Sequence, residues 1–316
     1  MALDISLIKI FENITSRAAL ASYHFVGKKD KTAADKAAVD VMRNLLNNLD
    51  IQGKIVIGEG ELDEAPMLYI GEKVGTGKGL VMDIAVDPLE GTNFAANNLP
   101  GALSVLAVAE KNNLFHAPET YMNKIAVGSN IPRDAIDLDN SLKKNIYNLA
   151  DCKNKDITEL TACLLDRPRH KKIIEELNEL KVNLKLISDG DISGALLVSN
   201  EKYGVDIFMG IGGGPEGVLA ASALDAYNCN FQGRFIFEEE NDIYRAKKMG
   251  IKELDRKYEL SEIISGDSIF CATGITSGDL VKGIKLIDDK YSSETLVTHK
   301  NSNTKKVIKR TENLTS

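Results

Sequence analysis

The sequence lacks the cysteine pattern of a zinc knuckle or of a disulfide-stabilised domain. Its four cysteines, Cys152, Cys163, Cys229 and Cys271, lie far apart and form no Cys-x-x-Cys pair. Zinc sites and disulfide frameworks of small domains use closely or regularly spaced cysteines, so neither is expected here. We predict four buried thiols that form no disulfide.

An excess of positive charge is also missing. Lys and Arg number 39 against 46 Asp and Glu, which gives a formal net charge of −7. A net-acidic surface repels a phosphate polymer, so the composition argues against a nucleic-acid partner. A single anionic metabolite remains compatible with this charge, because a few placed cations or one metal ion can hold it.

No long apolar segment indicates a membrane span or an export signal. Asp4, Lys9, Glu12 and Arg17 interrupt the apolar runs near the N-terminus. The longest uncharged stretch, 91–109, contains three asparagines and a proline and would cross a bilayer poorly. We therefore predict a cytoplasmic protein without a membrane partner.

Hydrophobic periodicity predicts an α/β protein with an α+β domain over 1–155 and a mostly parallel α/β domain over 156–316. Thr32 and Asp35 resemble the capping box of a helix start. The tail after Val307 is expected to fray. The helices expected from the pattern cover 6–25, about 32–49, 168–180, 191–200 and 214–226. The expected strands cover 54–57, 80–86, 103–109, 161–165, 182–187, 205–209, 235–237 and 268–272.

Acidic side chains gather where two of the expected strands end. The first strand leads into Gly58-Glu59-Gly60-Glu61-Leu62-Asp63-Glu64, and the second leads into Asp87-Pro88-Leu89-Glu90-Gly91-Thr92. Like charges this close are costly unless a cation neutralises them, although each loop alone also fits a solvated acidic turn. The loops contain no histidine or cysteine, and oxygen-only ligand sets favour Mg²⁺ or Mn²⁺.

A glycine-rich run, 210–217, follows another expected strand and opens a helix. It matches the Gly-x-Gly-x-x-Gly pattern of dinucleotide-binding folds, with acids at 238–240 where such folds have one. However, Pro215 removes an amide hydrogen that a pyrophosphate would use, and Glu216 puts a negative charge at the helix N-terminus. We favour a metal ligand beside a phosphate, and an NAD(P)-binding oxidoreductase is the alternative of another class.

Two further clusters suit a sugar phosphate. Arg167-Pro168-Arg169-His170 follows the strand at 161–165, and its two guanidinium groups can hold a phosphate. Asp189-Gly190-Asp191 follows the strand at 182–187 and offers acceptors for sugar hydroxyls. A solvated basic turn and a helix N-cap are the simpler interpretations of these two clusters.

Taken together, these segments resemble the class II fructose-1,6-bisphosphatases of the lithium-sensitive, metal-dependent sugar-phosphatase superfamily. The likeness runs from Gly27 to about Thr295, and the most specific part is the long motif 57–73. Arg167 stands where the family often has lysine, Gly214 where it usually has alanine, and 93–98 also departs from it. The other segments that carry the likeness are 27–35, 83–92, 117–122, 189–191, 210–217, 271–276 and 293–295.

The resemblance implies a layered α/β/α/β/α fold and hydrolysis of the 1-phosphate of fructose 1,6-bisphosphate to fructose 6-phosphate, a gluconeogenic step. It places the acidic loops in the domain 1–155, and the sugar-phosphate contacts with one metal ligand in 156–316. It also implies Mn²⁺ or Mg²⁺ as cofactor and a homo-oligomer, a dimer or a tetramer. The implied metal ligands are Asp35, Glu59, Asp87, Glu90 and Glu216. The implied substrate contacts are Lys31, Glu90, Gly91, Thr92, Tyr121, Arg167, Pro168, Arg169, Asp189, Gly190, Asp191 and Gly213.

For catalysis we expect Thr92 to orient a metal-activated water and Asp63 to accept its proton, since a hydroxyl of ordinary pKa needs such a base. Lys31 or Lys124 is expected to stabilise the transition state. Sedoheptulose 1,7-bisphosphate is an alternative or additional substrate, because both sugars share the reacting end. A sugar-phosphate sensor without activity is disfavoured, since it would be expected to lose Thr92 or a ligand acid.

Overall fold

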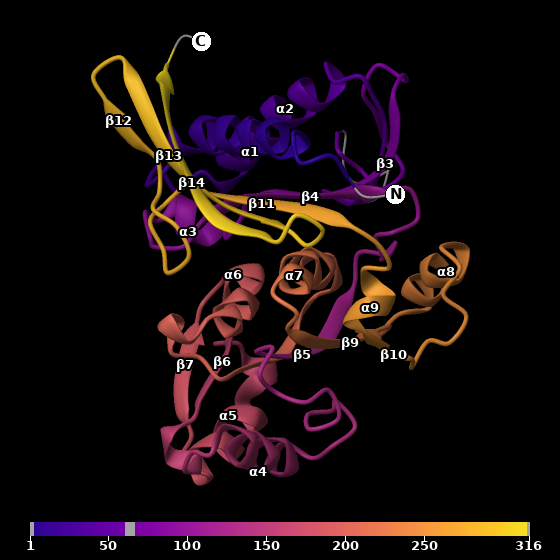
Figure 1. Ribbon diagram of the computed structural model, residues 1–316, viewed down its shortest axis with the longest axis vertical. Coiled ribbons are helices and arrows are strands. Elements are labelled where there is room, and N and C mark those ends of the chain that lie inside the picture. The colour runs from indigo at the N-terminus through magenta and orange to yellow at the C-terminus, as the bar shows by residue number, and fades with distance from the viewer. Residues whose placement is uncertain (1–2, 61–66, 315–316) are drawn as a thin grey trace. The chain divides into compact units, whose positions relative to one another are not determined.

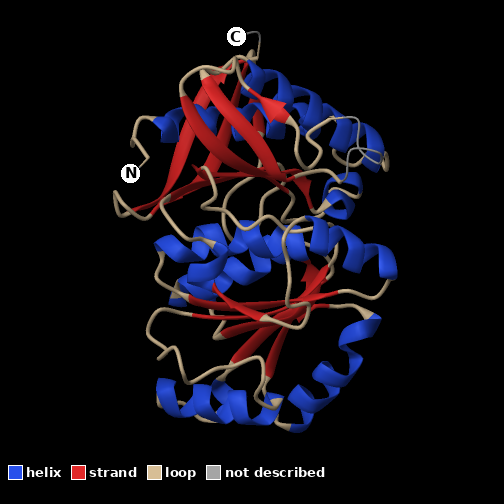
Figure 2. Ribbon diagram, turned by 90° about the vertical axis from the view of Figure 1, so that its right-hand side faces the viewer, coloured by secondary structure: helices blue, strands red, loops and turns tan. Residues whose placement is uncertain are grey.

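The computed structural model describes residues 3–60 and 67–314 and confirms a mixed α/β protein (Figures 1 and 2). The chain divides into two compact units, each with its own sheet. Unit 1 comprises Met1–His116 and Ile264–Ser316, and unit 2 comprises Ala117–Ile263. The sequence predicts two contiguous halves that meet at residue 155. The structural units differ because β11 (Ser268–Gly274) pairs antiparallel with β4 (Leu103–Glu110).

Unit 1 is a mixed sheet with two long helices packed on one face. The strand order is β12-β13-β11-β4-β3-β1-β2, with β14 paired to β13. Helices α1 and α2 bury Phe11, Ile14 and Met42 against the sheet residues Ile84 and Val108. The remaining elements are α1 (Leu7–Tyr23), α2 (Lys31–Asn47), β1 (Ile51–Ile57), β2 (Lys73–Val74), β3 (Leu80–Glu90), α3 (Thr92–Ala96), β12 (Lys285–Ile287), β13 (Lys290–His299) and β14 (Thr304–Asn313).

Unit 2 is a second mixed sheet with helices on both faces (Figure 2). Its order is β10-β9-β5-β8-β6-β7. The parallel pairing expected for this half occurs where β6 joins β7 and β8, whereas β5, β9 and β10 pair antiparallel. Its elements are β5 (Tyr121–Val127), α4 (Leu142–Lys153), β6 (Thr161–Leu165), α5 (Lys171–Glu179), β7 (Asn183–Ile187), α6 (Asp191–Leu196), β8 (Ile207–Gly213), α7 (Gly214–Ala226), β9 (Asn230–Ile236), α8 (Glu240–Lys248), β10 (Lys257–Glu259) and α9 (Leu260–Ile263).

Several sequence-based details need correction. Helix α2 is capped by Asp30, whose side chain accepts the Ala33 N–H at 2.9 Å, so the cap lies two residues before Thr32. All four cysteines are thiols without a disulfide, but Cys152 is exposed. Within the described residues, none of the helices combines the length and apolar character needed to cross a bilayer.

The segment after Val307 does not fray, because it forms β14 and is fastened to α1. Arg310 on β14 donates from Nε to both carboxylate oxygens of Glu12, at 3.1 and 3.0 Å. Its Nη1 also donates to Asn13 at 3.1 Å. Glu12 is 1% exposed. A charge buried this far needs a partner, so the polar strand is held by an ion pair that hydrophobic periodicity does not reveal.

We predict that Arg310→Ala lowers the free energy of unfolding by about 3–5 kcal/mol, because it leaves the Glu12 carboxylate buried without its guanidinium partner. Urea denaturation followed by circular dichroism measures the change. Lys309→Ala is the matched control: Lys309 pairs with Glu294 at the surface, with a side chain 75% exposed, and should change stability little. Equal stability of the Arg310→Ala and Lys309→Ala proteins would contradict the role of the buried pair.

Candidate active site

In unit 1, the predicted acids of the second loop lie at the end of β3. Asp87 pairs with Val105 and Glu90 with Leu103, with a register shift between them. Glu90 is 5% exposed, and Asp87 is half-buried. Gly91 follows with φ of 79°, a left-handed conformation that favours glycine, and caps the short helix that begins with Thr92. The sequence Asp-Pro-Leu-Glu-Gly-Thr therefore turns sharply and keeps two carboxylates and one hydroxyl close in the chain.

In unit 2, the glycine run forms the junction between β8 and α7. A Cβ atom at Gly213 would lie 1.7 Å from Oε2 of Glu216, and one at Gly212 would lie 2.0 Å from Oδ2 of Asp191. These glycines therefore make room for two carboxylates packed against the backbone. The Glu216 carboxylate lies beside the N-terminal residue of α7, where a dinucleotide-binding fold would hold the pyrophosphate. The structure thus disfavours the oxidoreductase alternative.

One oxygen of the Glu216 carboxylate, the buried Oε2, has no hydrogen-bond partner among the described residues. Burial raises the pKa of Glu216, and the negative charge of Asp191 adds to the rise, while Lys124 opposes it. An oxygen buried in this way is a good ligand for a cation.

Lys124 neutralises the neighbouring acid. It lies on β5, is 1% exposed, forms an ion pair with Asp191 and donates to the carbonyl of Gly213 at 2.7 Å. These contacts favour a role for Lys124 in holding Asp191 and the β8–α7 junction over the role in the transition state suggested by the sequence. Lys31, the other candidate for that role, is exposed at the first turn of α2.

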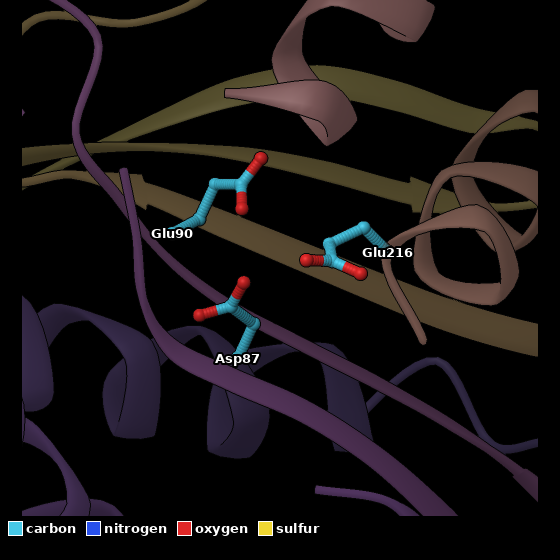
Figure 3. Close-up of side chains that lie close together, drawn as sticks. All are labelled: Asp87, Glu90 and Glu216. Atoms are coloured by element: carbon cyan, nitrogen blue, oxygen red, sulfur yellow. The ribbon is translucent and has the colours of Figure 1, made fainter. Parts of the chain in front are cut away.

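Three of the predicted ligands offer carboxylate oxygens to a cation. Asp87 and Glu90 lie at the end of β3 in unit 1, and Glu216 lies in the first turn of α7 in unit 2 (Figure 3). The donors are all carboxylates, which suits a hard divalent cation such as Mg²⁺ or Mn²⁺. The buried Oε2 of Glu216 and the other carboxylate oxygens therefore fit the Mn²⁺ or Mg²⁺ expected from the sequence.

The two other predicted ligands lie on other elements of unit 1. Asp35 is on α2, where burial raises its pKa to about 6. Glu59 follows β1, and its N–H donates to the carbonyl of Leu68 at 3.0 Å. Leu68 in turn donates to Glu72, which accepts from Arg43 at 2.6 Å. Asp63, the predicted base, lies outside the described residues.

The predicted sugar-phosphate contacts form a cluster in unit 2. Arg167 caps the 3-10 turn Pro168–His170 and lies 3.9 Å from Asp189. The guanidinium of Arg169 lies over the ring of Tyr121, 4.8 Å from its centroid, and Tyr121 is 45% exposed. Gly190, with φ of 85°, caps α6 immediately before the buried Asp191. Two guanidinium groups, a phenol and a carboxylate are therefore available near one another.

Sequence reasoning gave no role of their own to two supporting residues beside these candidates. Glu72 lies within the long acidic motif, and His170 directly follows the basic turn. Both are buried. Glu72 accepts from the N–H of Leu68, the residue whose carbonyl binds the N–H of Glu59, and His170 accepts from the N–H of Ile211 on β8. The only available signal was a polar residue adjacent to a motif, which does not distinguish a supporting contact from a solvated side chain.

Comparison with known proteins assigns the family. The family model described as bacterial fructose-1,6-bisphosphatase, glpX-encoded, matches residues 6–312. The chain belongs to this family. It is thus a phosphatase, a phosphoric monoester hydrolase, as the resemblance in sequence motifs implies.

Curated relatives match over almost their full length. Fructose-1,6-bisphosphatase class 2 of Haemophilus influenzae is 42% identical over 308 residues, which cover 93% of this chain and 92% of the relative. Fructose-1,6-bisphosphatase 1 class 2 of Escherichia coli K12 is 44% identical, with coverage of 93% and 91%. A Prochlorococcus marinus protein named D-fructose 1,6-bisphosphatase class 2/sedoheptulose 1,7-bisphosphatase is 41% identical, covering 92% of each chain.

Among solved structures, the inositol monophosphatase of Anabaena aligns with a TM-score of 0.33 and 10% identity, covering 61% of this chain and 71% of that one.

We predict that Gly213→Ala weakens binding of Mn²⁺ at least tenfold while the protein stays folded, because the added methyl group displaces the Glu216 carboxylate rather than core atoms. Titration calorimetry gives the affinity, and a thermal melt reports the fold. Glu216→Gln is the comparison variant and should show the same loss. Wild-type Mn²⁺ affinity in a folded Gly213→Ala protein would contradict this account of the glycine.

Proposed function

We propose that this protein hydrolyses the 1-phosphate of fructose 1,6-bisphosphate to give fructose 6-phosphate and inorganic phosphate, a gluconeogenic reaction. The observation that carries the proposal is the match to the bisphosphatase family over residues 6–312. The acidic group Asp87, Glu90 and Glu216 gives it a chemical basis, since phosphate transfer to water requires neutralisation of the phosphate charge.

Asp87, Glu90 and Glu216 are proposed to hold Mn²⁺ or Mg²⁺, with Asp35 and Glu59 as further ligands. A divalent cation bound there would neutralise phosphate oxygens and lower the pKa of water. Thr92 would orient the attacking water, and Asp63 would accept its proton as the new P–O bond forms. The bond between phosphorus and the C1 oxygen breaks, and that oxygen leaves with a proton as the hydroxyl of fructose 6-phosphate.

The substrate is proposed to lie against unit 2. Arg167 and Arg169 would bind the phosphate that is not cleaved, because paired guanidinium groups suit phosphate oxygens. Asp189 and Asp191 would accept hydrogen bonds from sugar hydroxyls, with Tyr121, Pro168, Gly190 and Gly213 lining the sugar. Glu90, Gly91, Thr92 and Lys31 complete the proposed contacts. Action in the cytoplasm and assembly into a dimer or tetramer remain part of this proposal.

Sedoheptulose 1,7-bisphosphate is a second candidate substrate. The Prochlorococcus marinus relative is named for both sugar bisphosphates. The two compounds share the reacting end, so the proposed site would treat the cleaved phosphate alike in both.

Phosphate release tests the proposed reaction. Fructose 1,6-bisphosphate should lose one phosphate in the presence of Mn²⁺ or Mg²⁺ and none in EDTA, because EDTA removes the ion that activates the attacking water. Fructose 6-phosphate is the control and should release none. Sedoheptulose 1,7-bisphosphate under the same conditions tests the second candidate. Absence of release with both ions would overturn the proposed function.

We predict that Thr92→Ala lowers kcat at least a hundredfold, since it removes the hydroxyl that orients water, and that Asp63→Ala does the same by removing the base. Thr92→Ser keeps the hydroxyl and should keep most activity. Steady-state kinetics of the folded variants measures these effects. Turnover by Thr92→Ala near that of Thr92→Ser would exclude the hydroxyl from catalysis.

A further inference from the structure

On one of its two sides, β8 pairs with a neighbouring strand over only part of its length. Its whole length pairs with β5, from Tyr121↔Gly213 to Val127↔Ile207. On the other side, the register with β6 consists of Ala162↔Ile207 and Cys163↔Phe208. From Met209 onward, other groups must satisfy the backbone polar atoms on that side of β8.

The turn after β6 supplies those groups from its side chains. Nε of Arg169 donates to the carbonyl of Ile211 at 2.8 Å. The N–H of Ile211 donates to Nε2 of His170 at 2.7 Å. The other ring nitrogen, Nδ1, donates to the carbonyl of Leu165, the last residue of β6, at 2.7 Å. The imidazole therefore bridges the ends of two strands and continues their pairing.

These contacts require one form of the histidine. The Leu165 carbonyl can only accept and the Ile211 amide can only donate, so His170 is neutral, with its hydrogen on Nδ1. His170 is 0% exposed. Gly210, with φ of 129°, makes room for the ring, since a Cβ there would lie 2.8 Å from Nε2. On β8, Gly210 thus leaves space for the histidine ring, and Ile211 donates a hydrogen bond to it.

The connection reaches groups that the proposed function assigns to substrate. Two consecutive residues, Arg169 and His170, hold both backbone polar groups of Ile211, and the guanidinium of Arg169 also lies over Tyr121. Movement of the turn relative to β8 would therefore displace Arg167 and Arg169 together. The imidazole bridge therefore contributes to the position of both arginines relative to β8.

We propose that His170 is a positioning residue, which fixes the turn 167–169 against β8 so that its arginines are placed to bind the phosphate that is not cleaved. The inference rests on the proposed function for the identity of the ligand. It assigns His170 an effect on substrate affinity rather than on the chemical step, because the histidine itself contacts protein groups.

The test uses two substitutions that each keep one half of the bridge. An Asn amide nitrogen can take the place of Nδ1, whereas a Gln amide oxygen can reach the place of Nε2. His170→Asn should raise KM and the Kd for fructose 1,6-bisphosphate about tenfold, the effect of losing one hydrogen bond that orders the site, with kcat within about twofold. His170→Gln keeps the acceptor for Ile211 and should stay within about threefold of wild type. His24→Asn, at an exposed histidine, is the matched control.

Kinetics with Mn²⁺ gives KM and kcat, calorimetry in EDTA gives Kd without turnover, and thermal melts check the fold. Wild-type KM and Kd in a folded His170→Asn protein would overturn the inference, as would equal losses in the Asn and Gln variants. If wild-type protein binds the bisphosphate but releases no phosphate, the proposed function fails while the Kd comparison still decides the role of His170. If wild-type protein does not bind it, the turn does not recognise this ligand and the inference fails.

Discussion

Where β8 meets α7, the carboxylate of Glu216 packs against the backbone of Gly213, and one of its oxygens is buried with no hydrogen-bond partner in the described part of the chain. A carboxylate in such surroundings is costly in its charged form. The neighbouring groups reduce this cost. Lys124 neutralises Asp191, two glycines leave room for the acids, and the helix N-terminus favours negative charge beside it. The negative charge of Glu216 itself remains, and a divalent cation would neutralise it.

The candidate site was predictable to the extent that strand ends can be read from sequence. Asp87 and Glu90 lie at the end of the hydrophobic strand β3, and Glu216 lies just after the hydrophobic strand β8, where the sequence predicts them. The fold class could be predicted for the same reason, since helix and strand periods differ. Helix α7 was placed at its observed bounds, because a glycine run and a proline mark its start clearly.

Pairing partners and polar contacts were beyond the sequence. Strand β5 was missed, and the antiparallel pairing of β5 with β8 has no local signal, because periodicity defines an element without naming its neighbour. The strand β14 was mistaken for a frayed tail, since most of its side chains are polar and its contacts with α1 are polar, among them the buried ion pair between Arg310 and Glu12. His170 was overlooked for a related reason: its two backbone partners come from different strands.

The route of the chain through the two units has a consequence for synthesis. Unit 2 is one continuous segment, Ala117–Ile263, whereas the sheet of unit 1 needs β11, β13 and β14 from the segment that follows it. Domains fold as units while the chain emerges from the ribosome. Helices α1 and α2 can pack on β3 and β4, which are made before unit 2, but α1 also packs on β11 and β13. That part of the apolar face of α1 stays uncovered until the ribosome has made all of unit 2 and then β11. The first part of this chain to be translated is thus among the last to be completed.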